Sequence, residues 1–321
     1  MQDDEVVSKK LKLFIFKGII ALGFVLATNL GTFMKLRKGE KEIYKRPPRR
    51  YEIPKYRMGM KYCQSDEKYL RPTLYCNCRA PEIIAMANKL GAFKKSDYEY
   101  AKDVFEFVKR NVILEFLPMD DVVDTLRRGT GTCIHKISLF IALCRAAGIK
   151  ARYKLYAPII TEAWYEHLVG ADPLAGRWYN AMGYFILHGE GEVYIDGKWV
   201  VADVGPTPER QAAQGIPITK FGEDSIGTWF YAVPNTITKI ECLSKLTGRF
   251  GSYLSNIFMK KLAPASFARI NNSILQQIEK GKKILEEMGE EEYDEQARKK
   301  YKPRLPEVEL IERPEIVFES D

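Results

Sequence analysis

Histidine is scarce in this chain of 321 residues, which contains three: His135, His167 and His188. The sequence also lacks an internal repeat, a phosphate-binding loop and a dinucleotide fingerprint, so nothing in it predicts a nucleotide site. Six cysteines are present, but the Cys-Asn-Cys run at residues 76–78 has no second pair at a zinc-binding spacing. We therefore expect no metal and no cofactor. Six cysteines in a chain of this length are typical of reduced thiols.

Surplus charge is absent from most of the chain. Residues 1–60 carry fourteen Lys/Arg and six Asp/Glu, whereas the remaining residues carry 36 of each. The net charge of +8 therefore belongs to the N-terminal arm. This distribution argues against a broad nucleic-acid-binding surface, and no nucleic-acid partner is expected. The length suffices for one large domain or two small ones.

Residues 18–34 form an uncharged run that is flanked by Lys17 and Lys35. As a helix the run is about 25 Å long, slightly short for a bilayer. A cleavable signal peptide is disfavoured, because a clear cleavage site is missing and the far flank is basic. We expect membrane association, but three arrangements stay open. The helix spans the bilayer, lies on anionic lipid with help from the basic residues within 9–50, or packs on the protein itself. A spanning helix with this basic flank places the main domain in the cytoplasm.

Local patterns predict several further segments. Prolines among arginines and tyrosines at 45–60 indicate an extended linker or wrapping arm. Residues 160–180 are expected to form a long irregular insertion, either a substrate wall or an aromatic cluster that anchors a surface loop. Residues 206–234 are expected to form an extended loop. Residues 273–288 have the periodicity of an amphipathic helix, and the charged residues 290–302 are expected to be solvated.

A glycine-rich turn at residues 129–132 leads into an apolar segment that ends at Gly148, the pattern of a loop and a helix. Cys133 occupies the junction, where unpaired backbone N–H groups and the helix dipole favour a thiolate, so we expect a lowered pKa. Gly129 and Gly131 are expected to leave the approach to the thiol open. The alternative is an ordinary buried cysteine in an apolar helix. His135 lies about 200° around the helix from Cys133 and cannot act as its base.

A second motif is the Asp-Gly dipeptide at 196–197, a strong signal for a two-residue hairpin turn. The predicted register pairs Ile195 with Lys198 and places His188 opposite Gly205. Asp203 is then a diagonal neighbour of His188, about 7–8 Å away. Glu190 and Glu192 share this face, and solvated charges are the default expectation for them. His167 is a reserve base should His188 be misplaced.

These motifs together resemble the transglutaminase-like superfamily of papain-type cysteine enzymes, including prokaryotic transglutaminase-like domain proteins. The resemblance covers about residues 97–207. It rests on Gly131-Thr132-Cys133 and on the helix and strand that follow at 139–152. It rests further on His188 four residues before Glu192 and on Trp199 four residues before Asp203. It implies an α+β fold with the nucleophile helix packed on an antiparallel sheet. It also implies a catalytic triad of Cys133, His188 and Asp203. The chain departs from many members at Glu190, where they have an aromatic residue.

The resemblance implies acyl transfer on a protein or peptide amide through a thioester, with a thiolate–imidazolium pair as the reactive group. Hydrolysis is favoured over transglutamination because water is always present. The expected organisation is a basic arm at 1–60, a catalytic domain at 61–265, and an amphipathic helix with a charged tail at 266–321. Two alternatives stay open: a non-catalytic scaffold that binds peptide in the same cleft, and a membrane-surface adaptor whose functional part is the basic arm.

Overall fold

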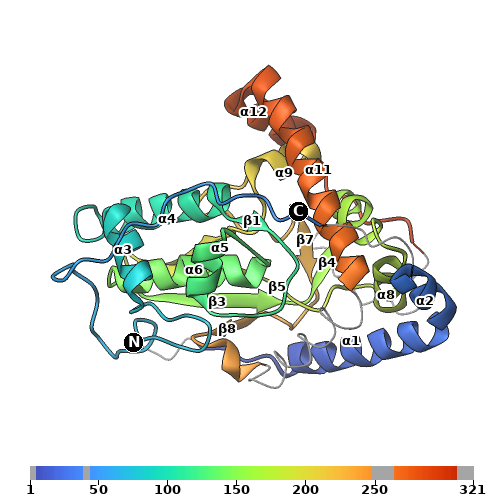
Figure 1. Cartoon of the computed structure of the whole chain (residues 1–321), viewed down its shortest axis with the longest axis horizontal. Coiled ribbons are helices and arrows are strands. Elements are labelled where there is room, and N and C mark those ends of the chain that lie inside the picture. The colour runs from blue at the N-terminus through green and yellow to red at the C-terminus, as the bar shows by residue number, and fades with distance from the viewer. Residues whose placement is uncertain (1–4, 39–43, 247–263, 309–321) are drawn as a thin grey trace.

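A four-stranded antiparallel sheet forms the centre of the structure, a computed structural model that describes residues 5–38, 44–246 and 264–308 (Figure 1). In spatial order its strands are β6 (Lys198–Ala202), β5 (His188–Ile195), β3 (Ala151–Tyr156) and β8 (Thr238–Ile240). Two small two-stranded sheets consist of parallel β1 (Ile113–Leu114) and β2 (Thr130–Gly131), and antiparallel β4 (Pro158–Ile160) and β7 (Phe230–Ala232). Helices surround the four-stranded sheet, so the predicted α+β class is confirmed.

The β5–β6 hairpin has the predicted register. Ile195 pairs with Lys198, and the ladder continues to Gly191 and Ala202. Asp196 and Gly197 have φ values of 50° and 81°, which a two-residue turn of the favoured hairpin type requires. Asn, Asp and Gly tolerate this left-handed region best, so the dipeptide explains both the turn and the register.

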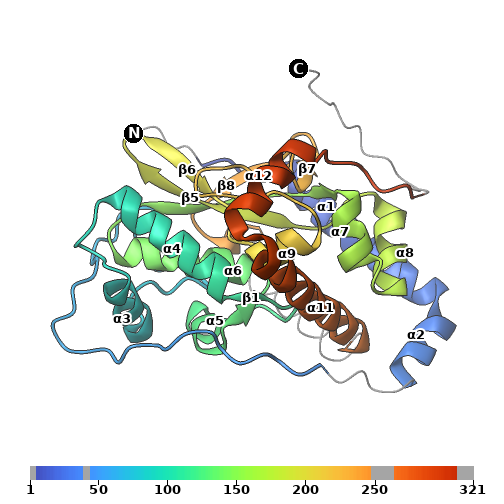
Figure 2. The same cartoon turned by 90° about the horizontal axis from the view of Figure 1, so that it is seen from above.

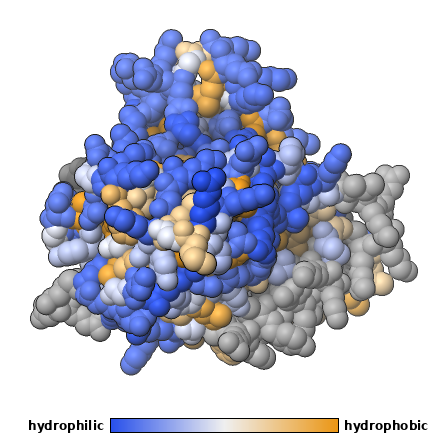
Figure 3. All heavy atoms as spheres, turned by 60° about the vertical axis from the view of Figure 1, so that its left-hand side comes forward, coloured by the Kyte–Doolittle hydropathy of each residue, from blue (hydrophilic) through white to orange (hydrophobic). Residues whose placement is uncertain are grey.

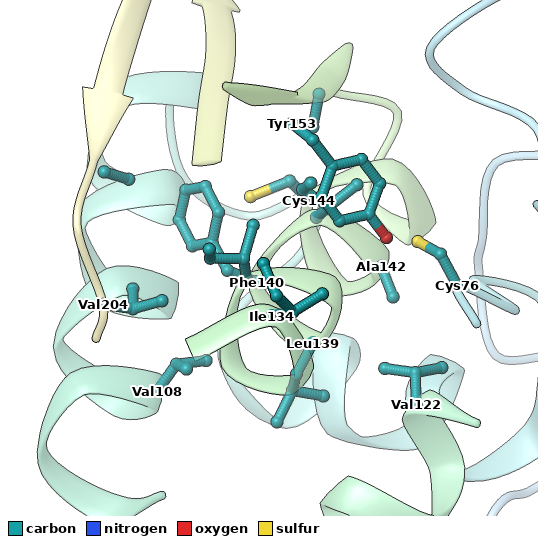
Figure 4. Close-up of a cluster of buried hydrophobic side chains, with 14 of the residues drawn as sticks. Cys76, Val108, Val122, Ile134, Leu139, Phe140, Ala142, Cys144, Tyr153 and Val204 are labelled. Carbon is teal, nitrogen blue, oxygen red and sulfur yellow. The ribbon is translucent and has the colours of Figure 1, made fainter. Parts of the chain in front are cut away.

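Helix α6 (Cys133–Ala146) is the central helix of the fold and packs on β5 and β3. The surrounding helices also contact it: α3 (Pro81–Lys89), α4 (Asp97–Asn111) and α5 (Val122–Arg128). Helix α6 spans Cys133–Ala146, and every residue from Ile134 onward is buried. Figure 4 shows Leu139 and Phe140 of this helix among core side chains from α4 and β3. Its apolar, Ala- and Leu-bearing sequence is therefore explained by contacts on all sides.

Glycines on β5 allow α6 to approach the sheet. A methyl group at Gly191 would lie 2.6 Å from Cδ1 of Phe140, and one at Gly189 would lie 2.8 Å from the carbonyl oxygen of Lys154 and 3.5 Å from Cδ1 of Ile137. Contacts below 3 Å are not tolerated by a real side chain, so the strand needs glycine at both positions. Gly191 thus lets α6 approach the sheet, and Gly189 leaves room for the neighbouring strand β3.

Of two sequence-based expectations about loops, the one for 160–180 is wrong and the one for 206–234 holds only in part. The segment 160–180 is not an irregular insertion but largely helical, with α7 (Glu162–Trp164), the π-helical turn η1 (Tyr165–Val169) and α8 (Pro173–Met182). The segment 206–234 contains α9 (Pro208–Ala213) and β7. Both α8 and α9 begin with proline after a capping side chain, Asp172 or Thr207. These helices are too short for apolar periodicity to reveal them.

The C-terminal helices pack on the body. Helix α11 (Pro264–Met288) lies against α9, and α12 (Glu290–Lys300) follows it (Figure 2). The amphipathic helix predicted at 273–288 is confirmed and begins earlier. Most charged residues of the segment 290–302 are exposed, as expected, but α12 also buries one side that contains Tyr293, Asp294 and Ala297.

The N-terminal arm is divided between a helical part and an extended part. Helix α1 (Lys9–Thr28) and helix α2 (Leu30–Lys38) lie along one side of the molecule (Figure 1). Residues 44–60 then cross the body in extended form, where Arg46 pairs with Glu115 and the Tyr51 hydroxyl donates to the carbonyl of Leu126. The wrapping arm is confirmed. The division into 1–60, 61–265 and 266–321 stays a prediction, and its last thirteen residues lie outside the described part.

The close approach of β3 to Gly189 makes Gly189→Ala destabilising. The added methyl group meets the backbone carbonyl of Lys154, which cannot move without disturbing β3. We expect a loss of about 1–3 kcal/mol of unfolding free energy, measured by urea denaturation. Gly23→Ala is the matched control, because a methyl group there meets nothing within 4 Å and α1 gains helix propensity. Equal effects of the two substitutions would contradict this packing argument.

Candidate active site

Cys133 begins helix α6 through a capping arrangement that uses His135. Thr132 is the N-cap residue, and its hydroxyl accepts a hydrogen bond from the backbone N–H of His135. In return, Nδ1 of His135 accepts from the backbone N–H of Thr132 at 3.1 Å. The other ring nitrogen lies 3.2 Å from Oδ1 of Asp120. His135 therefore orders the turn before Cys133, and its exclusion as the base of that cysteine is confirmed.

The two glycines before Cys133 do not leave an open approach, contrary to expectation. Gly129 has φ of 75° at the end of α5, and Arg49 packs against it. A methyl group at Gly131 would lie 2.5 Å from Cβ of His135. The glycines are needed because other side chains occupy the space beside them.

His188 and Asp203 come together around Gly205. The Gly205 backbone N–H donates to Oδ1 of Asp203 at 2.8 Å. A methyl group at Gly205 would lie 2.9 Å from this oxygen and 3.5 Å from Cε1 of His188. The imidazole is buried beside the rings of Phe230 and Tyr156, with centroid distances of 4.1 and 5.7 Å. The hairpin register thus predicts the neighbourhood of His188, Gly205 and Asp203 correctly.

Two polar atoms at this junction have no hydrogen-bond partner within the described ranges. They are Nε2 of His188 and Oδ2 of Asp203, and both are buried. Buried polar groups normally have partners, and an exception calls for a physical reason. Both atoms are therefore available to bond to a group that is not part of the described chain.

Two buried lysines hold the turn that follows Asp203. Lys136 lies one helical turn after Cys133, and its ammonium donates to the carbonyl of Gly205 at 2.9 Å. Lys109 on α4 donates to the carbonyl of Pro206 at 3.0 Å. Both side chains are almost fully buried. The helix that carries Cys133 is therefore tied directly to the turn that orients Asp203.

Burial controls the protonation of the candidate residues. Burial and, to a smaller extent, the charge of Asp203 together raise the pKa of the Cys133 thiol to about 12. The backbone N–H of Ile134 and the charge of Lys136 oppose this rise without overcoming it. The expected lowering of the Cys133 pKa at the helix start is therefore wrong, because desolvation outweighs the helix terminus.

The pKa of the His188 imidazole shifts in the opposite direction. Burial lowers the pKa of His188 to about 4, and the charge of Lys154 adds to the effect, while Asp203 opposes it. Above this pH the imidazole is neutral. In the free protein at neutral pH, the thiol and the imidazole are both uncharged.

Glu190 and Glu192 are buried ion-pair partners, so the expectation of solvated charges is wrong. Glu190 pairs with Lys154 at 2.9 Å and Glu192 with Arg152 at 2.6 Å. Each pair joins residues that face one another across β5 and β3. Burial raises the pKa of Glu190 to about 7. The partners were not found from sequence because the β3–β5 register has no local turn to reveal it.

His167 lies elsewhere, on the wall of a surface cavity of about 520 Å³ that also includes Thr161 and Gln214. None of the three candidate residues lines this cavity. Burial lowers the pKa of His167. The structure therefore brings together Asp203 and His188 beside the turn tied to the Cys133 helix, and leaves His167 outside this group.

A family model described as the transglutaminase-like superfamily matches residues 84–204. These residues form a transglutaminase-like superfamily domain. The matched range contains Cys133, His188 and Asp203, and the α+β arrangement of α6 on the antiparallel sheet is the transglutaminase-like fold. The family expected from the sequence motifs is confirmed over this range.

A comparison with solved structures found a protein from Cytophaga hutchinsonii that is provisionally described as a cysteine protease. The TM-score is 0.33 and the identity is 19%, over 54% of this chain and 45% of that one. The chain thus spans less than half the length of that protein. A comparison with curated proteins gave no match.

The low pKa of His188 predicts a loss of stability in acid. Unfolding lets this imidazole take up a proton below its ordinary pKa of 6.5, whereas the folded protein resists protonation down to about pH 4. The wild type should therefore lose about 3 kcal/mol more than His188→Gln between pH 6.5 and 4. Urea denaturation at several pH values measures how the unfolding free energy of each protein changes with pH. The same change in both proteins would contradict the buried, neutral imidazole.

The influence of Asp203 on the thiol has a separate test. Asp203→Asn removes a negative charge near Cys133, so the pKa of the thiol should fall. Its alkylation by iodoacetamide, followed at Cys133 by mass spectrometry, should then reach a given rate at lower pH than in the wild type. Asp196→Asn is the matched control, because Asp196 lies in the exposed hairpin turn. An unchanged profile in Asp203→Asn would show that Asp203 does not act on the thiol.

Proposed function

We propose that this protein catalyses acyl transfer on protein or peptide amides through a thioester on Cys133. The sulfur of Cys133 forms a bond to the amide carbonyl carbon, and the C–N bond then breaks. The thiol proton passes to His188 and from there to the leaving amine. Asp203 orients the imidazole and stabilises its positive form. Water then attacks the thioester and releases a carboxylic acid and the free thiol.

One observation supports the proposal most. Asp203 and His188 lie together at the turn around Gly205, and Oδ2 of the one and Nε2 of the other are buried without a hydrogen-bond partner among the described residues. Gly205 contacts the carboxylate and the imidazole, while Lys136 connects it to the helix of Cys133. A nucleophile, a base and an orienting carboxylate are the parts that covalent acyl transfer needs.

The protonation states favour general-base catalysis over a preformed ion pair. A thiol with a raised pKa and an imidazole with a lowered pKa stay neutral until substrate arrives. We therefore infer that His188 removes the thiol proton as Cys133 attacks. This revises the thiolate–imidazolium pair expected from sequence. The charge separation then develops in the transition state, where Asp203 offsets the positive imidazole.

The acceptor decides between hydrolysis and transglutamination. Water gives a peptidase or amidase, and a primary amine gives a new amide. Hydrolysis is the proposed reaction because water is present at high concentration in any site that a substrate reaches.

A non-catalytic peptide-binding domain is the second candidate, and the raised pKa of the partly exposed Cys133 thiol favours it. A thiol and an imidazole that are both neutral also suit a domain that binds peptide without reacting with it. The two candidates differ in one property, because only an enzyme forms a covalent bond between Cys133 and a carbonyl carbon.

Peptide-library cleavage combined with activity-based labelling tests the proposal. A peptide probe that carries an electrophilic carbonyl should label wild-type protein at Cys133. Cys133→Ala should lose this labelling, and its turnover should fall by about 10⁴-fold or more. Cys63→Ala is the matched control, because Cys63 is also a partly exposed free thiol. Adding a primary amine distinguishes the acceptors by product mass. Peptide binding without labelling would refute acyl transfer and support the binding domain.

A further inference from the structure

Helix α1 is largely apolar beyond its lysines, yet the protein covers only one side of it. Among the described residues it is the one helix long and apolar enough to cross a membrane. Leu11, Gly18 and Val25 are its buried residues, and their spacing of seven places them on one line along the helix. A helix that is hydrophobic all round is normally enclosed on every side. Something other than the described chain must therefore cover the opposite face.

The covered face of α1 makes close and specific contacts with the body. The indole N–H of Trp178 on α8 donates to the carbonyl of Gly18 at 3.1 Å. A methyl group at Gly18 would lie 2.9 Å from Cγ1 of Ile186, so the two segments meet at van der Waals distance. Phe14 stacks on Tyr184 with ring centroids 4.4 Å apart. These contacts hold one side of the helix against the domain.

The chain just before and just after α1 is also tied to the body. Val6 pairs with Lys239 of β8 through two backbone hydrogen bonds of 2.9 and 2.7 Å. Ser8, the N-cap of α1, donates to Asn235 and Thr238. At the other end Asn29 contacts Arg177 of α8. A helix that crossed a bilayer away from the domain would lose all of these contacts.

The opposite face of α1 is an exposed apolar stripe. Its large side chains are 45–66% exposed and recur at intervals of three or four residues. They are Leu13, Phe16, Ile19, Ile20 and Phe24. Exposed hydrophobic residues elsewhere in the described chain, such as Met58 and Phe93, are scattered, and the surface in Figure 3 is largely hydrophilic. A contiguous stripe of this kind marks an interaction surface.

Charge identifies the occupant of this stripe. Lys9 and Lys12 are exposed at the start of the helix, and Lys35 is exposed beyond its end on α2. Cations around an apolar helical face match the headgroups and acyl chains of an anionic bilayer. The same lysines disfavour a second copy of the chain, because like charges would meet across the interface.

We propose that α1 lies in the plane of an anionic membrane, with its covered face on the protein and its apolar stripe in the lipid. The helix is about 30 Å long and would enter to a depth of about 5–10 Å. It holds the transglutaminase-like domain at the surface without crossing the bilayer. The expectation of a cytoplasmic main domain relied on a spanning helix, so it does not carry over to this arrangement. The proposal is independent of the chemistry at Cys133.

Binding of the full chain to vesicles tests the proposal. Wild-type protein should cosediment with vesicles of phosphatidylcholine mixed with phosphatidylserine, and more weakly with phosphatidylcholine alone. Phe16→Glu combined with Phe24→Glu should weaken binding by at least about tenfold, because two apolar side chains leave the lipid. Met58→Glu is the matched control, since Met58 is 97% exposed on another segment. Thermal unfolding without lipid checks that all variants fold.

Depth measurements distinguish the in-plane helix from a spanning one. Phe16→Trp and Phe24→Trp place probes about 12 Å apart along the helix. Lipids brominated at a series of acyl positions should quench both added fluorophores at the same shallow depth. Different depths would show that the helix spans and would overturn the proposal. Absence of vesicle binding would also overturn it, as would a lipid-free dimer that the double glutamate variant dissociates.

Discussion

The turn after Asp203 is held by two buried ammonium groups, and the arrangement of the site depends on this contact. Lys136 reaches it from the helix that begins with Cys133, and Lys109 reaches it from α4. Both ammonium groups are removed from water, which lowers the pKa of Lys109 to about 8 and that of Lys136 well below its ordinary value. Their hydrogen bonds go to uncharged oxygens, namely the backbone carbonyls of the turn and, for Lys109, also the side-chain amide of Gln211. The turn and the two helices must therefore form together.

The same exclusion of water governs the chemistry of the site. A medium of low polarity opposes charge on Cys133 and on His188 alike, so each is most stable in its neutral form. The sheet itself is buried on both faces. Leu155 and Tyr153 line the α6 side, whereas the Arg152–Glu192 and Lys154–Glu190 pairs occupy the other. Ion pairs in this position contribute more to a unique strand register than to net stability.

Local sequence signals predicted the parts of the fold that short-range physics controls. The helix that begins at Cys133 and the Asp196-Gly197 turn are both present as predicted. Each depends on residues within a few positions of one another. Segments whose form depends on distant partners were harder to predict. The helices within 160–180 are stabilised by capping and by contacts with the C-terminal helix, and they lack a periodic apolar pattern of sufficient length.

For the site, the sequence by itself determined that Cys133 begins a helix and that His188 and Asp203 share a hairpin. Both follow from backbone rules that operate locally, namely the signals that start a helix and the alternation of side chains along a strand. Only the tertiary structure decided the protonation of these groups, because desolvation is a property of the surrounding protein and not of the neighbouring residues. It also decided that one face of α1 packs on α8 while the other stays exposed, since an evenly apolar helix carries no signal that distinguishes its faces.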